Sequence, residues 1–321
     1  MACDITITNI GQRNRQWLPI DPPDDGSATI GGVVATGVAG AQQFGYGPPR
    51  RHFIGMKVVL ADGSLVKAGA RVVKNVAGYD LCKLFTGSYG TLGIIVEVNF
   101  KLRPLPLVTR TVLISGQPEE LLAAAQRIIQ APLFPVAVEL MSQNLVSQLT
   151  DAASEANAFL MIRFAGSDSA VSAQITRTQE LAGLGKNSIL LIEEDEAIWA
   201  GLQALPIRFS DRLTWRVGLR PTEAASFLLE LIKTSDSETM WHGGVGDGRI
   251  RVIDGSDAHD DDAEIRIEHL RKNTEARGGM IIIESGNGGM DRPLFSKHSA
   301  VGIMNKVKQQ LDPNNMFPSG R

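Results

Sequence analysis

The sequence predicts an α+β protein with two domains. Its length of 321 residues favours two domains over one. Residues 74–102 join a short apolar helix to a glycine-spaced turn and an alternating strand, which together offer a backbone surface suited to a ligand. After residue 107, strand and helix patterns alternate in three rounds, and this is typical of a sheet layered with helices on one face.

The first part of the chain contains a rigid segment, a glycine-rich run and a loop. Asp21-Pro22-Pro23 predicts a rigid extended segment, because the proline ring fixes φ. The glycine-rich run T-I-G-G-V-V-A-T-G at 29–37 has two interpretations that spacing leaves open. It is either a loop and helix start whose backbone lies against a ligand, or a tightly packed contact between a helix and a sheet. Residues 44–51 predict a loop, with its two arginines in solvent rather than at a phosphate.

Residues 53–70 predict a β-hairpin. Met56, Val58 and Leu60 alternate with other side chains before an Asp62-Gly63 turn, and an apolar strand then returns. The hairpin leads directly into the glycine-spaced stretch.

The stretch 74–102 organises the first domain. A short helix is expected around residues 81–85, and glycines at 87, 90 and 93 space the turn after it. Glycine leaves main-chain N–H groups bare of side chains, so such a turn can lie against a phosphate, a ribose or a flat ring. A strand follows, in which apolar residues alternate with polar ones from Ile94 to Leu102. Pro104 and Pro106 then mark a domain boundary.

The second domain is expected to alternate strands with helices. Pro118 suits the first turn of a helix, where its missing N–H has no helical partner to lose. The expected strands cover 109–114, 136–141, 158–164, 188–193, 212–219, 239–243, 249–253 and 280–284, and the expected helices cover 118–130, 168–184, 221–233, 263–276 and 299–310.

Composition excludes several classes of protein. A formal net charge of −3 with 21% charged residues gives no case for nucleic-acid binding. Cys3 and Cys82 are too few for a disulfide framework and fit a reducing compartment. No apolar run has the roughly 18–20 residues of a membrane span, and the N-terminus lacks signal-peptide features. A cytoplasmic protein is expected, with peripheral attachment to the inner membrane through partner subunits left open.

No motif identifies a catalytic side chain. The sequence has no G-x-G-x-x-G between a strand and a helix, no P-loop, no G-x-S-x-G and no metal-ligand spacing. Arg163, Arg216 and Arg220 are candidate partners for a substrate carboxylate, with exposed or structural roles as the favoured alternative. The signal for a site therefore lies in backbone-rich loops.

Three ordered motifs resemble the FAD-binding domain of the p-cresol methylhydroxylase/vanillyl-alcohol oxidase (PCMH/VAO) flavoprotein superfamily. They are T-I-G-G-V-V-A at 29–35, K-N-V-A-G-Y-D-L at 74–81 and G-S-Y-G-T-L-G-I-I-V-E at 87–97. Two further runs, Q-W-L-P-I-D-P-P at 16–23 and D-P-N-N-M-F-P-S-G-R at 312–321, resemble the FAD-binding subunits of glycolate oxidases (glycolate dehydrogenases). The resemblance is strongest over 16–106.

The resemblance implies a division of the chain and a set of FAD contacts. It implies a partial FAD-binding PCMH-type domain over 1–106, an α+β cap domain with an antiparallel sheet over 107–278, and a segment, 279–321, that returns to the FAD domain. The implied contacts to flavin and pyrophosphate are Pro23, Thr29, Ile30, Gly31 and Gly32, and those to the ribityl and adenosine portions are Gly87, Ser88, Gly90, Thr91, Gly93 and Ile94.

This sequence departs from the pattern of that family in three places. The family carries a βαβ-like unit with a pyrophosphate loop before the region where this chain starts. At the C-terminus, Phe317-Pro318-Ser319-Gly320 stands where the family usually has Phe-Asn-Pro-Gly. Residues 241–248 resemble the His-x-Gly-Asp-Gly-x-x-His run of the catalytic sister subunit, in which histidines hold a metal. The second histidine is missing here, so a structural role is expected for His242, and no metal site.

The resemblance implies two alternative functions. The first is an FAD-binding subunit of a glycolate (2-hydroxy acid) oxidase complex, which oxidises glycolate to glyoxylate beside a catalytic FAD subunit and an iron–sulfur subunit. The second is a non-catalytic structural subunit that binds FAD weakly or not at all. A standalone FAD oxidase is disfavoured, because residues 1–50 offer only Cys3 for a covalent flavin link.

Overall fold

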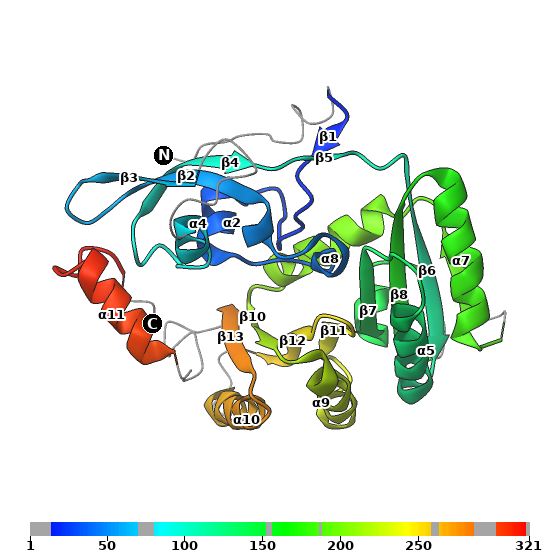
Figure 1. Ribbon diagram of the computed structural model, residues 1–321. Coiled ribbons are helices and arrows are strands. Elements are labelled where there is room, and N and C mark those ends of the chain that lie inside the picture. Colours follow the sequence, from blue (N-terminus) through cyan, green and yellow to red (C-terminus); the bar gives the residue numbers. More distant parts are fainter. Residues whose placement is uncertain are drawn as a thin grey trace. The chain divides into compact units, whose positions relative to one another are not determined.

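A computed structural model describes residues 14–69, 80–151, 156–185, 188–257, 263–285 and 300–318 (Figure 1). The chain divides into two compact units. The first combines Met1–Leu105 with Lys297–Arg321, and the second is Pro106–Ser296. Residues 74–79 of the K-N-V-A-G-Y-D-L motif lie outside the described residues.

The first unit is built on a three-stranded antiparallel sheet in the order β3-β2-β4. The predicted hairpin is confirmed, because β2 and β3 pair and Gly63 adopts a φ of 80° in the turn. Two short helices, α3 and η1, occupy the segment expected to be a loop. The elements are β1 (Gln16–Trp17), α2 (Ile30–Thr36), α3 (Gln43–Tyr46), η1 (Pro49–Arg51), β2 (Phe53–Val59), β3 (Leu65–Gly69), α4 (Leu81–Phe85), β4 (Ile94–Phe100), β5 (Arg103–Pro104) and α11 (Val301–Leu311).

Strand β4 contains an irregularity that the sequence pattern does not reveal. Lys57 of β2 pairs with Glu97, but the next residue of β2 pairs with Ile95, so β4 carries one extra residue at this point. The extra residue leaves Ile94 and Val96 exposed to 57% and 54%. The expectation of unbroken alternation from Ile94 onward is therefore wrong, because a β-bulge shifts the alternation by one residue.

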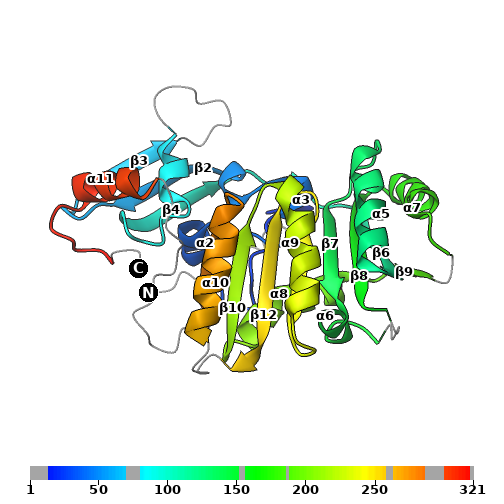
Figure 2. The same cartoon turned by 90° about the horizontal axis from the view of Figure 1, so that it is seen from below.

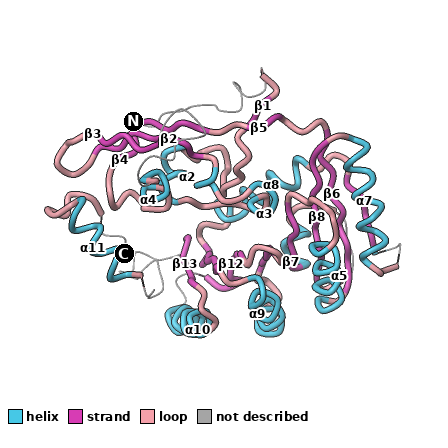
Figure 3. The backbone as a smooth tube through the Cα atoms, viewed as in Figure 1, coloured by secondary structure: helices cyan, strands magenta, loops and turns pink. Residues whose placement is uncertain are grey.

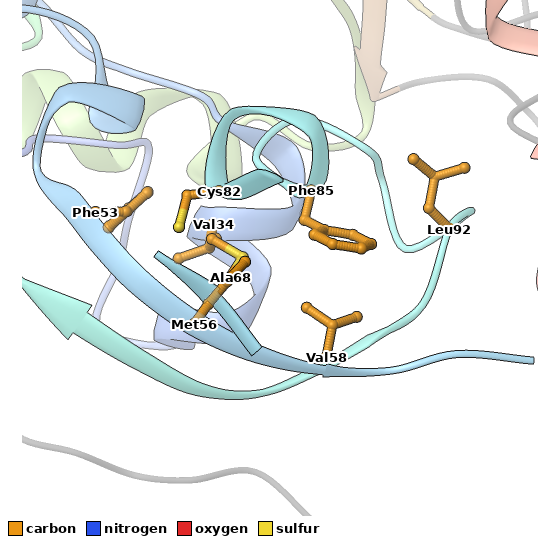
Figure 4. Packing of buried hydrophobic residues seen from close by; sticks show 8 residues of the cluster. All are labelled: Val34, Phe53, Met56, Val58, Ala68, Cys82, Phe85 and Leu92. Atoms are coloured by element: carbon orange, nitrogen blue, oxygen red, sulfur yellow. The ribbon is translucent and has the colours of Figure 1, made fainter. Parts of the chain in front are cut away.

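The core of this unit lies between the sheet and the helices α2 and α4. Figure 4 shows side chains from both helices and from the sheet pointing toward one another, and α11 adds Val307 and Leu311 at the edge of the cluster. This packing fixes α2 and the end of α4, which carry the predicted ligand loops. The cluster comprises Val34, Phe53, Met56, Val58, Ala68, Cys82, Phe85 and Leu92.

The second unit is an eight-stranded sheet in the order β13-β10-β12-β11-β7-β8-β6-β9 (Figure 3). Every neighbouring pair is antiparallel, which confirms the α+β class with an antiparallel sheet. Its elements are β6 (Val108–Gly116), α5 (Pro118–Gln130), β7 (Ala137–Ser142), α6 (Gln143–Ser147), β8 (Ala158–Gly166), α7 (Asp168–Ala182), β9 (Ile189–Ile192), α8 (Glu196–Arg208), β10 (Arg212–Gly218), α9 (Pro221–Thr234), β11 (Met240–Gly244), β12 (Arg249–Asp257), α10 (Ala263–Ala276) and β13 (Met280–Ser285).

Helices cover both faces of this sheet, so the expectation of helices on one face is wrong. Helices α5, α7, α9 and α10 lie on one face (Figure 2). Helix α8, which the sequence pattern did not predict, lies on the other, where Trp199 Nε1 donates to Thr111 Oγ1 at 2.8 Å. Pro206 lies inside α8. An interior proline removes a helical hydrogen bond, so the sequence pattern does not predict a helix across this residue.

Strand β13 extends the second unit beyond the expected boundary at residue 278. It pairs with β10, so residues 280–285 lie in this sheet, and the return to the first unit comes at residue 297. Within the described ranges, no helix combines the length and apolar character needed to cross a bilayer.

Candidate functional site

Helix α2 begins at the first predicted ligand loop. Thr29 is its N-cap, and its Oγ1 accepts a hydrogen bond from the Gly32 amide at 3.2 Å. The carboxylate of Asp24 accepts the amides of Gly26 and Ala28 at 2.8 and 2.9 Å, which orders the loop just before the cap. The predicted helix start is thus confirmed, and the amides of the first turn project from a fixed loop.

The residue that anchors the preceding segment is Asp21, which the sequence analysis did not single out. Its carboxylate is buried and accepts amides from Gly40 at 3.1 Å and Gln42 at 2.7 Å. These bonds join the Asp21-Pro22-Pro23 segment to the chain that follows α2. Pro23, a predicted contact, is half-buried two residues from this anchor.

The glycine turn docks on the C-terminal end of α2. The amides of Gly87 and Tyr89 donate to the carbonyls of Val34 and Ala35 at 3.0 and 2.7 Å. A Cβ at Gly37 would lie 3.2 Å from the Gly87 Cα, so the two backbones meet closely. The structure therefore brings the two predicted ligand loops together along a single helix, whose seven residues span roughly 10 Å.

The glycines of the two loops fall into two groups. A Cβ at Gly31 or Gly90 would meet no described atom within 4 Å, whereas a Cβ at Gly93 would lie 2.6 Å from Val58 Cγ1. Gly93 is thus needed for packing on the sheet, and the amide of Gly87 is used by α2 rather than bare. Contact with a ligand stays a prediction at Gly31 and Gly90.

The unbonded backbone amides of the two loops are chemically suited to bind part of an FAD. Among the described residues, the amides of Ile30, Gly31 and Gly90 have no hydrogen-bond partner, and a Cβ at either glycine would have open space around it. The first turn of α2 contains no acidic residue, so the positive end of the helix is not neutralised there. A phosphate or the edge of a flavin ring has the negative charge or acceptor atoms that such amides bind.

The other predicted contacts are in or beside the glycine turn. The Ser88 carbonyl accepts from the amide and Oγ1 of Thr91 at 3.0 and 2.7 Å, which closes the turn. Ile94 starts β4 with an exposed side chain. Ser88 and Thr91 therefore shape the turn.

The second unit carries a buried charged group on the sheet face opposite α9. Glu139 of β7 is fully buried and accepts from His242 Nδ1 and Arg249 Nη2, each at 2.7 Å. Burial opposes the ionisation of Glu139, but Arg249 and His242 outweigh it and hold the pKa of Glu139 below its usual value. Burial also lowers the pKa of His242, so a neutral imidazole donates its Nδ1 proton to the carboxylate.

The predicted carboxylate-binding arginines are used inside the protein. Arg216 and Arg251 both bind Glu284, with Nε–oxygen distances of 2.9 and 2.6 Å. Arg163 binds the fully buried carboxylate of Asp195 at 2.8 Å. Burial opposes the ionisation of Glu284, and Arg251 followed by Arg216 outweighs it, which lowers the pKa of Glu284.

The remaining candidates also have structural positions. The backbone of Arg220 is at the N-cap of α9, and its exposed side chain makes no capping hydrogen bond. His242 lines a narrow apolar crevice between β11, β12, α6 and α8. Within the described parts of the chain, no three His, Cys, Asp or Glu side chains are grouped to hold a metal ion. The described thiol, Cys82, is buried in the core of the first unit, and burial raises its pKa.

Known proteins that are similar to this chain include FAD-binding ones. A family profile described as an FAD binding domain matches residues 7–69. The chain is 30% identical to the glycolate oxidase subunit GlcE of Escherichia coli (strain K12), covering 99% of this chain and 78% of that protein. It is 29% identical to the glycolate oxidase subunit GlcD of Bacillus subtilis (strain 168), covering 95% of this chain and 70% of that protein.

A solved structure shares the fold. Alkyldihydroxyacetonephosphate synthase matches with a TM-score of 0.63 at 17% identity, over 95% of this chain. This chain spans 61% of the length of that structure. The match in sequence to GlcE establishes the family. The chain belongs to the PCMH/VAO flavoprotein family of FAD-dependent oxidoreductases, in which its relatives include the glycolate oxidase subunits.

Proposed function

We propose that this chain is the FAD-binding subunit of a complex that oxidises a short 2-hydroxy acid, with glycolate as substrate and glyoxylate as product. The observation that carries the proposal is the set of bare amides at Ile30, Gly31 and Gly90, in a chain whose relatives are named glycolate oxidase subunits. Other relatives are named D-lactate and D-2-hydroxyglutarate dehydrogenases, which supports a 2-hydroxy acid as the substrate class.

The residues of this chain would bind and orient the cofactor. The first turn of α2 would hold a phosphate through the amides of Ile30 and Gly31, and the glycine turn would lie against the rest of the dinucleotide at Gly90. Bound flavin supplies the redox chemistry by accepting a hydride equivalent from the α-carbon of the substrate. The proposed partners are a catalytic FAD subunit and an iron–sulfur subunit, in the cytoplasm or peripheral to the inner membrane.

A second candidate is a structural subunit that does not oxidise substrate itself. It is favoured by a specific observation in the second unit: His242, Arg163, Arg216 and Arg251 are each bound to a carboxylate of this chain. A substrate carboxylate would have to compete with a carboxylate of this chain for each of these four side chains.

Titration with FAD tests the proposal and separates the candidates. The purified chain is mixed with FAD, passed through a desalting column and examined for visible flavin absorption. We expect near-stoichiometric flavin, which glycolate bleaches anaerobically when the partner subunits are present. A protein that stays colourless contradicts the proposal. That result favours the structural subunit, which is expected to bind FAD weakly or not at all. Retained flavin that glycolate does not bleach, even with the partner subunits, contradicts glycolate as the substrate.

A further inference from the structure

A lysine near the C-terminus lies at the centre of a group of acceptors in the first unit. Lys308 of α11 donates from Nζ to the carbonyl oxygens of Thr91 at 2.9 Å and Phe317 at 3.0 Å, and it also binds the carboxylate of Asp312. The ammonium group lies 5.8 Å from the centre of the Phe317 ring. One side chain thus joins α11, the segment after it and the glycine turn.

The acceptor side of this group is preformed. The carboxylate of Asp312 is fully buried and accepts the amides of Met316 and Phe317 at 2.7 and 2.8 Å. Burial opposes the ionisation of Asp312, but the hydrogen bonds from Lys308, Phe317 and Met316 outweigh it and lower its pKa. The carboxylate is therefore ionised at neutral pH, and it holds the Lys308 ammonium in place.

The glycine turn is held from two sides. Its first half is fixed on α2 by the amides of Gly87 and Tyr89, as described above. Its second half ends at Thr91, whose carbonyl accepts from Lys308 Nζ. Gly90, the bare position of the turn, lies between these two attachments, with a φ of 72°.

We propose that Lys308 is a positioning residue for FAD binding, which acts by fixing the carbonyl of Thr91 and with it the backbone at Gly90. The proposal rests on the proposed function, in which Gly90 faces the cofactor. A lysine suits this role because its compact ammonium group can serve three acceptors that converge on one point. Nothing in the local sequence around Lys308 indicates this contact, because Thr91 is 217 residues away.

Substitution of Lys308 by methionine tests the proposal. Lys308→Met keeps most of the side-chain length and removes the donors, and Lys306→Met removes an exposed lysine from the same helix as the control. We expect Lys308→Met to weaken FAD binding about tenfold, since a loosened turn must be ordered on binding. Hydrogen exchange at amides 88–93 of the FAD-free protein should also become faster, and Lys306→Met should change neither quantity.

The outcomes separate the two proposals. If the wild-type chain binds no FAD, the proposed function fails and the role of Lys308 fails with it. If the wild-type chain binds FAD and Lys308→Met binds it equally well, only the role of Lys308 is overturned. A lysine that merely anchors the C-terminal segment would change the melting temperature and leave FAD affinity, measured well below that temperature, unaltered.

A second variant covers the case in which Lys308→Met does not fold. Lys308→Arg keeps the positive charge beside Asp312, but its planar head cannot place one atom among the same three acceptors. We expect an intermediate FAD affinity and intermediate exchange in the turn. Wild-type values for both quantities would contradict the proposal.

Discussion

Replacing Glu139 with alanine is expected to lower the free energy of unfolding by about 3–5 kcal/mol, because it leaves the buried Arg249 without its fully buried counter-ion. His242 would lose the same acceptor, and Arg249 would keep its longer bond to Asp247 at 3.2 Å. The fold of the second unit should survive with lower stability, since the substitution touches one face of the sheet. Urea unfolding followed by circular dichroism measures the loss.

The control for this variant is an exposed ion pair in the same unit. Glu238 lies 3.8 Å from Arg212, and its side chain is 69% exposed. Glu238→Gln should cost about 0–1 kcal/mol, because solvent screens the pair. Equal losses of unfolding free energy for the two variants would contradict the larger contribution expected from the buried carboxylate of Glu139.

The second large effect is expected at Gly40, in the first unit. A Cβ there would lie 2.0 Å from the carbonyl oxygen of Asp21 and 2.6 Å from its Oδ2. Gly40→Ala should therefore displace the Asp21 carboxylate from the amides that it binds. The free energy of unfolding should fall by about 3 kcal/mol, because overpacking and the loss of buried hydrogen bonds both destabilise the fold. Thermal unfolding of the FAD-free chain measures this loss.

Gly302→Ala is the matched substitution. Gly302 lies in helix α11, and a Cβ there meets no described atom within 4 Å. Alanine should stabilise the helix by roughly 0.5–1 kcal/mol relative to glycine. If Gly40→Ala is as well tolerated as Gly302→Ala, the anchoring role of Asp21 is contradicted.

Much of the fold could be predicted because its signals are local. Helices such as α5 and α9 follow from apolar spacing and a proline in the first turn, and the β2–β3 hairpin follows from alternation around Asp62-Gly63. Helix α8 was missed because Pro206 interrupts its pattern, and the bulge in β4 because it depends on pairing with β2. The place of β13 beside β10 depends on contacts between segments far apart in the chain.

The residues of the candidate site also differ in whether their contacts are local in the sequence. The start of α2 was predictable, because Thr29 and the glycines after it form a cap within a few residues. Asp21 and Lys308 were not, because their partners lie 21 and 217 residues away and nothing in the local pattern indicates them. The ion pairs that bind Arg163 and Arg216 likewise appear only once strands and helices have been brought together.

FAD is proposed to lie against the backbone at the start of α2, and a pair of glycine substitutions tests this position most directly. Gly31→Phe and Gly302→Phe each begin a large side chain at a Cβ position that meets no described atom within 4 Å, so we expect both variants to fold. FAD titration followed by flavin fluorescence should show at least about a tenfold weaker affinity for Gly31→Phe, because the ring occupies the space of the cofactor. Gly302→Phe should bind FAD as the wild type does. Equal FAD affinity of both variants and the wild type would contradict the account.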